Sequence, residues 1–542
     1  MPSPTARSPE TIKRLTLIAC ILGSGIALLD GTVVNVALPT IERHLGGGLA
    51  AQQWIVNAYL LTLGSLILVG GSLGDVYGER RIFALGVGGF GAASLLCALA
   101  PSIGALIAAR ALQGVASALL TPSALAVIVA TFPESERGAA IGSWTAWGGI
   151  AAVLGPLLGG ELLALGSWRW IFLINVPFVA VCLGIVLTVI PRRERHAGQR
   201  IRAGRTVDLP GALLCALGLG GPVFALIEQP RLGWSSPAVL ASMILGVALL
   251  VCFLLYERRA RDPMLPLGLF RRRNFSAGNA ETLAMYAGLS ILLFFLILYL
   301  QQIGGYTPLQ GGLATLPVAL VMFALSRRFG MLADRHGPRL FMGAGPLIAA
   351  AGLLSFQRIG IRIDYLTEVL PGLLVFALGL AMTVAPLTAA VLAGVEESQA
   401  GIASGVNNAI ARVASLLGTA AVGALVAASF GATLDSELAG VALGPSAHAT
   451  VHEAKRLPLG RPDVSGLPKP QAHAVTLAAE RASEESFHLG LAIAAALVAL
   501  GGVAGVAGIR NPDRVVSAEE CSGGQLVGAS VEAAAHLAGP SA

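Results

Sequence analysis

The sequence contains few charged residues. Asp, Glu, Lys and Arg make up 12% of its 542 residues, whereas a soluble globular protein carries about 25%. Much of the remaining sequence forms repeated apolar blocks of about 20 residues, each long enough to cross roughly 30 Å of hydrocarbon. These properties exclude a soluble enzyme, a disordered regulator and a nucleic-acid-binding protein. The net charge of +6 comes from arginines between the apolar blocks, where they act as topology determinants.

The sequence also lacks the motifs of catalytic and metal sites. Its six cysteines form no CxxC pair, and five of them lie in apolar blocks, where we expect small core residues. There is no phosphate-binding glycine loop, no nucleophile elbow and no His/Cys cluster. We therefore expect neither an enzyme nor a bound metal or cofactor. The first apolar block is too long for a cleavable signal peptide and is expected to act as a signal anchor.

Fourteen apolar blocks are predicted to be membrane-spanning helices. Their expected ranges are 15–39, 53–74, 82–100, 103–131, 139–165, 170–190, 209–227, 237–256, 279–301, 309–330, 340–357, 368–394, 400–430 and 488–509. An even number places both termini on one side of the membrane. Most of the 36 Lys and Arg residues fall on the side of the N-terminus, so this side is predicted to be cytoplasmic. We expect a multi-pass protein of the cytoplasmic membrane.

Two arginine-rich segments divide the chain. Residues 191–208 and 257–276 bracket the seventh and eighth helices, which leaves six helices before this pair and six after it. The sequence therefore predicts an N-terminal bundle, an inserted pair with its flanking loops, a C-terminal bundle and a disordered cytoplasmic tail rich in small residues. Their expected ranges are 1–190, 191–276, 277–509 and 510–542. The C-terminal bundle includes an external loop, 431–487, which we expect to be partly ordered.

One loop motif occurs at the same place in each set of six helices. The second and third helices are joined by GSLGDVYGERR in the first set and by GMLADRHGPR in the second. Glycine permits a tight turn at the membrane surface, and an Asp beside an Arg can bridge to neighbouring helices and helix termini. Such a cluster can latch the cytoplasmic ends of the two bundles; the alternative is a charged turn that only sets topology. The proposed latch residues are Gly71, Asp75, Gly78, Arg80, Arg81, Gly330, Asp334, Arg335, Gly337 and Arg339.

Two ionisable residues lie deep in predicted helices. Asp30 is roughly 14 Å and Arg110 roughly 10 Å from the external ends of their helices, by the rise per residue of an α-helix. Charges at such depth are costly unless they face a cavity or a partner. Because the depths are similar, we expect the two to be coupled, directly or through Gln113, and Asp30 to bind and release protons. The alternatives are an Asp that hydrogen-bonds to a neighbouring helix and an Arg that only satisfies helix carbonyl groups.

The fifth predicted helix is rich in small residues. These let helix backbones approach closely, and a proline inside a helix introduces a kink. The residues concerned are Gly142, Gly155, Pro156, Gly159 and Gly160. Three other charged residues in predicted helices are given no coupling role. Glu161 and Glu281 are expected to be interfacial. Arg412 is a further buried charge, and the alternative is a helix-terminus partner for one of the cytoplasmic loops.

Several of these motifs resemble those of a known family. The two loops are similar to the signature loop of the major facilitator superfamily, from which the first copy departs at Val76 and Glu79. LLDGTVVNVALPTI, QQWIVNAYLL and SWRWIFLINVPF resemble the fourteen-helix drug:proton antiporter branch, the QacA/EmrB-like multidrug efflux transporters. The fourth helix matches the family's motif at Arg110, Gln113 and Gly114. The fifth helix resembles the antiporter motif, departing only at Ala151.

The resemblance implies an all-α integral membrane protein with the major facilitator fold, in which fourteen helices form two pseudo-symmetric six-helix bundles plus an inserted pair. It implies efflux of lipophilic or amphipathic drugs driven by the proton gradient without a cofactor, with Asp30 and Arg110 in proton coupling. The substrate cavity is expected between the bundles near the membrane midplane. The residues expected in this cavity are Asp30, Asn35, Asn57, Tyr59 and Gln113.

Two alternative functions are kept open. A dedicated exporter of one endogenous metabolite, antibiotic or lipid would use the same proton antiport. A membrane sensor or embedded enzyme would need a signalling or catalytic segment, and the longest stretch outside the predicted helices, 431–487, lacks one. The expected partners are a small lipophilic substrate, protons and the lipid bilayer, without nucleic acid, and the protein is expected to be a monomer.

Overall fold

The structure is a computed structural model that describes residues 8–191, 207–392, 395 and 397–511. Within these residues, fourteen helices are long and apolar enough to cross a membrane, which confirms the predicted number. Most of the first arginine-rich segment and the predicted disordered tail from residue 512 onward lie outside the described residues. The described chain is helical, with turns and short connections between the helices.

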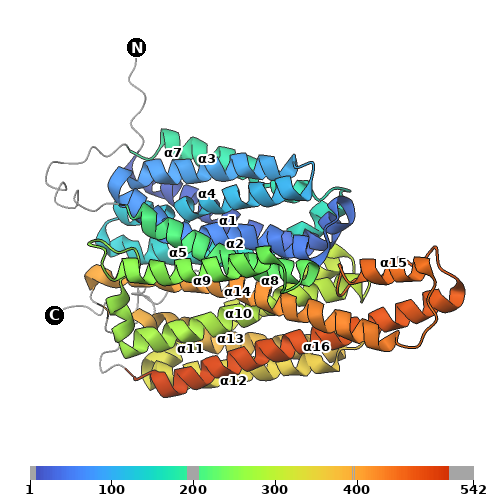
Figure 1. Ribbon diagram of the computed structural model, residues 1–542. Coiled ribbons are helices and arrows are strands. Elements are labelled where there is room, and N and C mark those ends of the chain that lie inside the picture. The colour runs from blue at the N-terminus through green and yellow to red at the C-terminus, as the bar shows by residue number, and fades with distance from the viewer. Residues whose placement is uncertain (1–7, 192–206, 393–394, 396, 512–542) are drawn as a thin grey trace, which may run out of the picture.

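Two sets of six spans and an inserted pair make up the fold (Figure 1). The first set is α1 (Pro9–Leu45), α2 (Gly48–Tyr77), α3 (Glu79–Ala98), α4 (Ile103–Thr131), α5 (Glu134–Ala164), and α6 (Trp170–Leu173) with α7 (Asn175–Thr188), which together form one span. The inserted pair is α8 (Leu209–Leu232) and α9 (Pro237–Glu257). The second set is α10 (Arg273–Gln302), α11 (Pro308–His336), α12 (Pro338–Ser355), α13 (Leu370–Leu392), α14 (Glu397–Glu437) and α16 (Lys469–Gly508). Short helical turns Leu267–Arg271, Phe356–Arg358 and Tyr365–Val369 and helix α15 (Pro445–Ala454) complete the chain.

Local sequence accounts for where several helices begin and end. The Ser8 and Ser102 hydroxyls accept hydrogen bonds from backbone amides in the first turns of α1 and α4, as N-cap residues do. Gly78 and Gly337 end α2 and α11 with φ angles of 95° and 83°, a conformation that glycine adopts without strain. The repeated loop motif therefore makes the same turn in both sets of helices.

The two sets pack in the same pattern. In the first set α1 contacts α4, α5 and α7, α2 contacts α4, and α3 contacts α4 and α7. In the second set α10 contacts α13, α14 and α16, α11 contacts α13, and α12 contacts α13 and α16. The sets meet through α2 against α14 and α5 against α11, and α8 of the inserted pair lies on α2 and α14. This pattern confirms the expected pseudo-symmetric fold.

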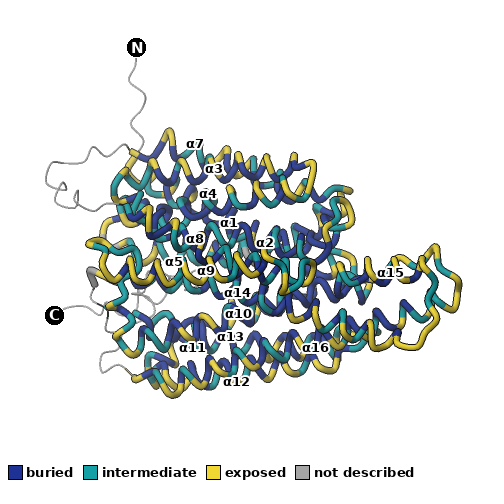
Figure 2. The backbone as a smooth tube through the Cα atoms, in the orientation of Figure 1, coloured by how far each residue is buried: buried dark blue, intermediate teal, exposed yellow. Residues whose placement is uncertain are grey.

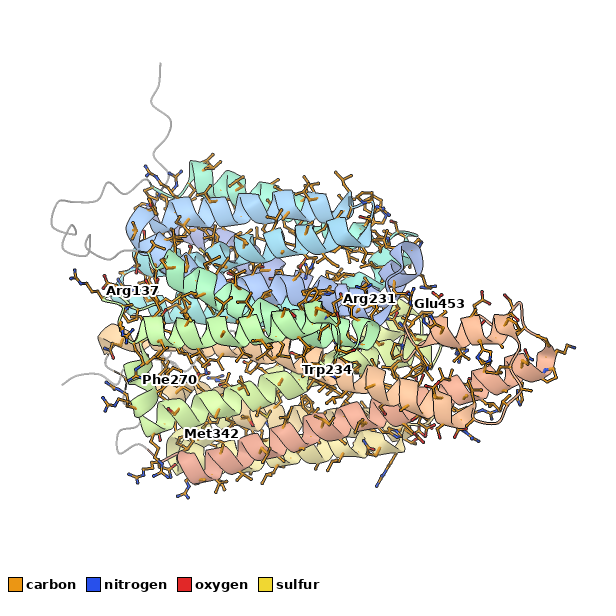
Figure 3. All side chains as sticks on the ribbon, viewed as in Figure 1. Arg137, Arg231, Trp234, Phe270, Met342 and Glu453 are labelled. Atoms are coloured by element: carbon orange, nitrogen blue, oxygen red, sulfur yellow. The ribbon has the colours of Figure 1, made fainter. Side chains whose placement is uncertain are left out.

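The outside of the helix bundle is apolar. Exposed residues line the outer faces and buried ones lie between the helices (Figure 2). Exposed apolar patches of this extent do not suit an aqueous surface, and hydrocarbon is the environment that fits them. Arg137 lies at one end of the bundle and Arg231 and Glu453 lie at the other (Figure 3). The exposed large residues of α9 include Leu240, Ile244, Leu245, Val247 and Val251.

The segment 431–487 is more ordered than expected. Helix α14 continues to Glu437 and α16 already begins at Lys469, so that these ends project with α15 beyond the other helices (Figure 1). We call this the α15 end, and the opposite end, which carries the two repeated turns, the arginine-rich end. The charges scattered along this segment make its amphipathic helices hard to recognise from the sequence. The apolar residues of these helices pack together in a small separate core. This core includes Phe430, Leu434, Leu438, Val451, Ala454, Val475, Ala478, Ala479 and Ala482.

Gly114 of α4 tests the close contact between α2 and α4. A Cβ atom at this position would overlap the Thr62 hydroxyl and the Tyr59 carbonyl oxygen. We expect Gly114→Ala to destabilise the protein by about 1–3 kcal/mol, because an overpacked contact forces the backbone to shift. Gly104→Ala in the same helix meets open space and should keep or raise stability, since Ala favours a helix. Equal melting temperatures of the two variants in detergent would contradict the contact.

Candidate functional site

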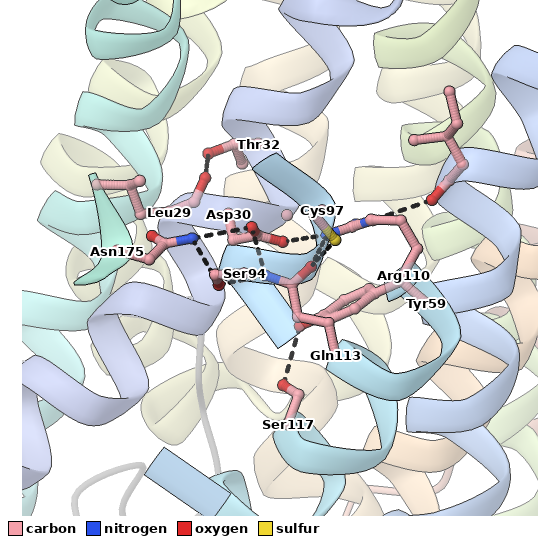
Figure 4. Close-up of polar contacts among 12 residues, drawn as sticks. Leu29, Asp30, Thr32, Tyr59, Ser94, Cys97, Arg110, Gln113, Ser117 and Asn175 are labelled. Atoms are coloured by element: carbon pink, nitrogen blue, oxygen red, sulfur yellow. Dashed lines mark hydrogen bonds and ion pairs between the residues drawn. The ribbon is translucent and has the colours of Figure 1, made fainter. Parts of the chain in front are cut away.

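Asp30 of α1 and Arg110 of α4 form an ion pair inside the first set of helices (Figure 4). Nη1 of Arg110 donates to Oδ2 of Asp30 at 2.5 Å. The Asp30 side chain is fully buried and the Arg110 side chain is 1% exposed. Salt screens such a pair far less than an exposed one, and removing one partner would leave an uncompensated buried charge. The structure therefore joins the two residues directly.

Three polar side chains complete the surroundings of the Asp30 carboxylate. Gln113 of α4 donates through Nε2 to Oδ1 of Asp30 at 2.9 Å, and Asn175 of α7 donates to the same oxygen at 3.2 Å. Both amides also donate to the hydroxyl of Ser94 on α3, at 3.0 and 3.3 Å. Neither Ser94 nor Asn175 was expected at this site. Asn175 stands inside the SWRWIFLINVPF motif, whereas a single serine in an apolar helix carries no signal.

Arg110 has partners besides Asp30. Its Nε donates to the carbonyl oxygen of Ile55 on α2 at 3.1 Å, and its Nη1 also donates to Oε1 of Gln113 at 2.6 Å. The guanidinium carbon lies 4.5 Å from the centre of the Tyr59 ring, a distance at which an aromatic face attracts a cation. The Tyr59 hydroxyl in turn bonds to Ser117 at 2.9 Å. Arg110 thus satisfies one helix carbonyl in addition to its ion pair.

A cavity of about 310 Å³ lies between the two sets of helices. Residues of α1, α2, α4 and α5 line it from the first set, and residues of α10, α11, α13 and α14 from the second. Of the residues expected in a substrate cavity, Asn35 and Tyr59 line it. Asp30, Asn57 and Gln113 are fully buried and are not among the lining residues. Arg110 does line the cavity, so the cavity is lined by the cationic partner of Asp30 and not by Asp30 itself.

Several hydrogen bonds join the two sets on the α15 side of the cavity. The Thr419 hydroxyl of α14 donates to Oδ1 of Asn57 at 2.9 Å, and the Gln53 amide donates to the Thr419 carbonyl at 2.6 Å. Near the same end, Gln301 of α10 donates to the Val36 carbonyl of α1 at 3.0 Å. Asn57 therefore joins α2 to α14 across the interface between the two sets.

The small residues of α5 divide between two neighbours. Cβ atoms at Gly155 and Gly159 would collide with or crowd Thr32 and Val33 of α1, so these glycines allow α1 to approach. A Cβ atom at Gly160 would overlap the backbone of Leu309 on α11. The carbonyl group of Pro156, the proline inside α5, lies against Gly312, which also belongs to α11. Gly142 lies further toward the arginine-rich end. The motif thus shapes both the α1–α5 and the α5–α11 contacts.

The repeated turns contact the last helix of their own set. Arg80 donates to the carbonyl oxygens of Val186 and Leu187 at the end of α7, at 3.0 and 2.7 Å. Arg339 donates to the Val506 carbonyl of α16 at 2.8 Å. Cations fit the negative end of a helix dipole. The other charged residues of the proposed latch are Asp75, Arg81, Asp334 and Arg335, all at least partly exposed. A latch between the two sets stays a prediction.

Three further charged residues of the helices differ in their burial. Glu281 of α10 is fully buried, and its carboxylate lies beside Gly505 of α16. Glu161 is exposed. Arg412 lies within α14, is half-buried and lines the cavity, so it is not at a helix terminus. Burial depends on how a helix is rotated, which a sequence with apolar residues on every face does not reveal.

Residues 20–419 match the Major Facilitator Superfamily. The chain belongs to this superfamily. It is therefore a multi-pass membrane transporter of small molecules.

The similarity to solved structures supports the superfamily fold. A bacterial homologue of the human lysosomal transporter Spinster, inward-facing and unoccupied, has a TM-score of 0.58 at 19% identity, covering 92% of this chain and 99% of its own. An auto-inhibited peptide transporter of the POT family gives 0.58 at 14% identity, covering 93% and 99%.

Curated superfamily members are similar over most of their length. The puromycin resistance protein pur8 of Streptomyces alboniger is 38% identical over 422 residues, which cover 77% of this chain and 82% of the relative. The multidrug resistance protein Stp of Mycobacterium tuberculosis is 36% identical and covers 78% of each chain. The tetracenomycin C resistance and export protein of Streptomyces glaucescens is 34% identical and covers 84% of each.

Removing Arg110 alone should be costly. Arg110→Gln leaves the buried Asp30 carboxylate without its cation, which is expected to destabilise the protein by about 3–5 kcal/mol. Asp30→Asn combined with Arg110→Gln should recover much of this loss, because neither charge is then left unpaired. Thermal unfolding in detergent of the single and double variants gives the interaction energy, with Arg358→Gln on the exposed surface as the control. An interaction energy near zero would show that the ion pair does not form.

Glu281 is expected to tolerate a neutral replacement. Neither of its carboxylate oxygens has a hydrogen-bond partner among the described residues, and an ionised carboxylate without a partner is costly in such surroundings. Glu281→Gln should therefore melt at the same temperature as the wild type or higher in detergent, as should Glu161→Gln at an exposed position. A clear drop for Glu281→Gln alone would mean that the acid has a partner that the amide cannot replace.

Proposed function

We propose that this transporter exports lipophilic or amphipathic compounds in exchange for protons. The observation that carries the proposal is the buried ion pair, in which Arg110 lines the cavity and Asp30 lies directly behind it. A carboxylate in this position can bind and release a proton, while its cationic partner touches the substrate space. Protonation of Asp30 and occupation of the cavity are thereby linked through one guanidinium group.

The geometry supports a specific coupling step. A proton on Asp30 would remove the charge that holds Nη1 of Arg110, while the Ile55 carbonyl and the Tyr59 ring would still hold the rest of the guanidinium. Helix α1 contacts α5, and α5 contacts α11 of the other set, so a shift of α1 reaches the interface between the two sets. In our proposal, protons from outside favour the inward-facing state, substrate displaces the proton, and the bundles then rock outward.

The proton gradient is the proposed energy source, and no cofactor takes part. Moving one charge through a potential of about 100 mV supplies about 2.3 kcal/mol, before any difference in pH is added. We propose that the protein works as a monomer, because each part of the coupling route described above lies within one chain. The hydrogen-bond partners of Asp30 come from α4 and α7.

The proposed direction of transport is out of the cell. The arginine-rich end carries Arg80, Arg81 and Arg339, and an excess of such residues characterises cytoplasmic loops. Both termini would then be cytoplasmic, and the α15 end would face outward. Export is further supported by the α5 motif and by relatives that are named for resistance to drugs or for export.

A dedicated exporter of one compound is the second candidate. It is favoured by the similarity to the tetracenomycin C resistance and export protein and to a probable actinorhodin transporter of Streptomyces coelicolor, 36% identical over 434 residues. A panel of unrelated toxic compounds separates the two candidates in a pump-deficient host. Resistance to several chemical classes supports multidrug efflux, and resistance to one compound supports the dedicated exporter.

Asp30→Asn tests the proposed coupling. The amide keeps the shape of the side chain but cannot carry a proton, so we expect proton-driven efflux to fall to the background of empty vesicles. The measurement is substrate uptake into everted membrane vesicles with an imposed proton gradient, at matched amounts of inserted protein. Asp463→Asn, an exposed position at the α15 end, is the control and should transport like the wild type. Undiminished transport by Asp30→Asn would refute the role of Asp30.

A further inference from the structure

The described lining of the cavity holds two charged side chains, and both are arginines. Arg110 is paired with Asp30. Arg412 of α14 makes no hydrogen bond or ion pair with any described residue. No carboxylate is among the described lining residues. The cavity wall therefore offers one cation whose charge no neighbouring side chain neutralises.

Two helices approach closely at the base of the Arg412 side chain. A Cβ atom on Gly64 of α2 would lie 3.2 Å from the Cβ of Arg412, so the missing side chain of Gly64 brings α2 close to the base of Arg412. Tyr59 and Tyr286 line the same cavity. Asn408 and Ser415 lie one turn away on either side and also line it. One face of α14 therefore presents a cation flanked by polar groups.

The described acidic side chains near the cavity do not pair with Arg412. Asp30 is held by Arg110, Gln113 and Asn175. Glu281 lies toward Gly505 on the far side of α10. Glu228 accepts hydrogen bonds from Trp54 and Arg231. An arginine at membrane depth is costly without a partner and is a functional-site candidate for that reason. The bound substrate is then the natural source of the missing anion.

We propose that Arg412 is the anion-recognition residue of the cavity, and that the preferred substrates are aromatic compounds carrying an ionised acidic group such as a carboxylate or phenolate. This rests on the proposed function, because it assumes that substrate occupies the cavity. A guanidinium binds carboxylate and related oxyanions through two parallel hydrogen bonds. An aromatic body fits the remaining wall, and the volume is that of a small-molecule site. The aromatic lining residues are Tyr59, Trp144, Tyr286, Phe294 and Phe323.

Two dyes with the same xanthene core separate charge from shape. Fluorescein is an anion at pH 7.5 and rhodamine 6G is a cation. Binding of each dye to purified protein is measured by fluorescence polarisation, with binding to protein-free micelles subtracted. We expect the wild type to bind fluorescein more tightly than rhodamine 6G. Arg412→Gln should weaken fluorescein binding at least about tenfold, as expected when a hydrogen bond to a charged group is lost, without weakening rhodamine 6G binding.

Two further variants show whether the effect is specific. Arg412→Lys keeps the charge and should retain part of the preference for fluorescein, since Lys offers a point charge without the planar fork. Arg362→Gln removes an equal charge from an exposed site outside the cavity and should bind like the wild type. The proposal is overturned if the wild type shows no preference for the anionic dye, or if Arg412→Gln weakens both dyes equally. Binding needs no proton gradient, so a failure of Asp30→Asn to abolish efflux would contradict the proposed coupling without changing this result.

Discussion

A charge buried among helices must be paired, and the Asp30–Arg110 ion pair meets this requirement for the first set of six spans. The side chains of the pair are almost completely buried, so groups on the surrounding helices supply most of their hydrogen bonds. Helices α4 and α7 provide donors to the carboxylate, and the Ser94 hydroxyl of α3 accepts from two of these donors. Helix α2 provides a carbonyl and an aromatic face to the guanidinium. In our proposal, the relative positions of these helices depend on the protonation state of this one acid.

The second set of spans repeats the packing of the first but not its chemistry. Its α10 carries Glu281, a buried acid without a hydrogen-bond partner among the described residues, and its α14 carries Arg412 at the cavity wall. Pseudo-symmetry therefore extends to helix contacts and to the turns at Gly78 and Gly337. In these turns the shape depends on the backbone conformation of the glycine. In our proposals the first set couples protons and the second recognises substrate. A conformational step that rocks the two sets therefore moves the proton-coupling residues relative to the substrate-recognition residue.

Particular residues show how far the sequence could predict the site. Depth along a helix follows from counting residues, which is why the meeting of Asp30 with Arg110 could be foreseen. The contribution of Ser94 could not, because a serine in an apolar helix carries no pattern. The segment 431–487 was underestimated for a related reason: alanine-rich helices with scattered charges show little periodicity, although they bury a common core.

The amino-acid sequence by itself determined the number of spans, the repeat within the chain and the type of protein, since these depend on length, hydrophobicity and local turn residues. Only the tertiary structure decided which side chains face one another. It placed Asp30 behind Arg110 rather than in the cavity, and it turned Arg412 inward. The physical reason is that in hydrocarbon nearly every face of a helix is apolar, so rotation about the helix axis is set by contacts between helices and not by the pattern along one of them.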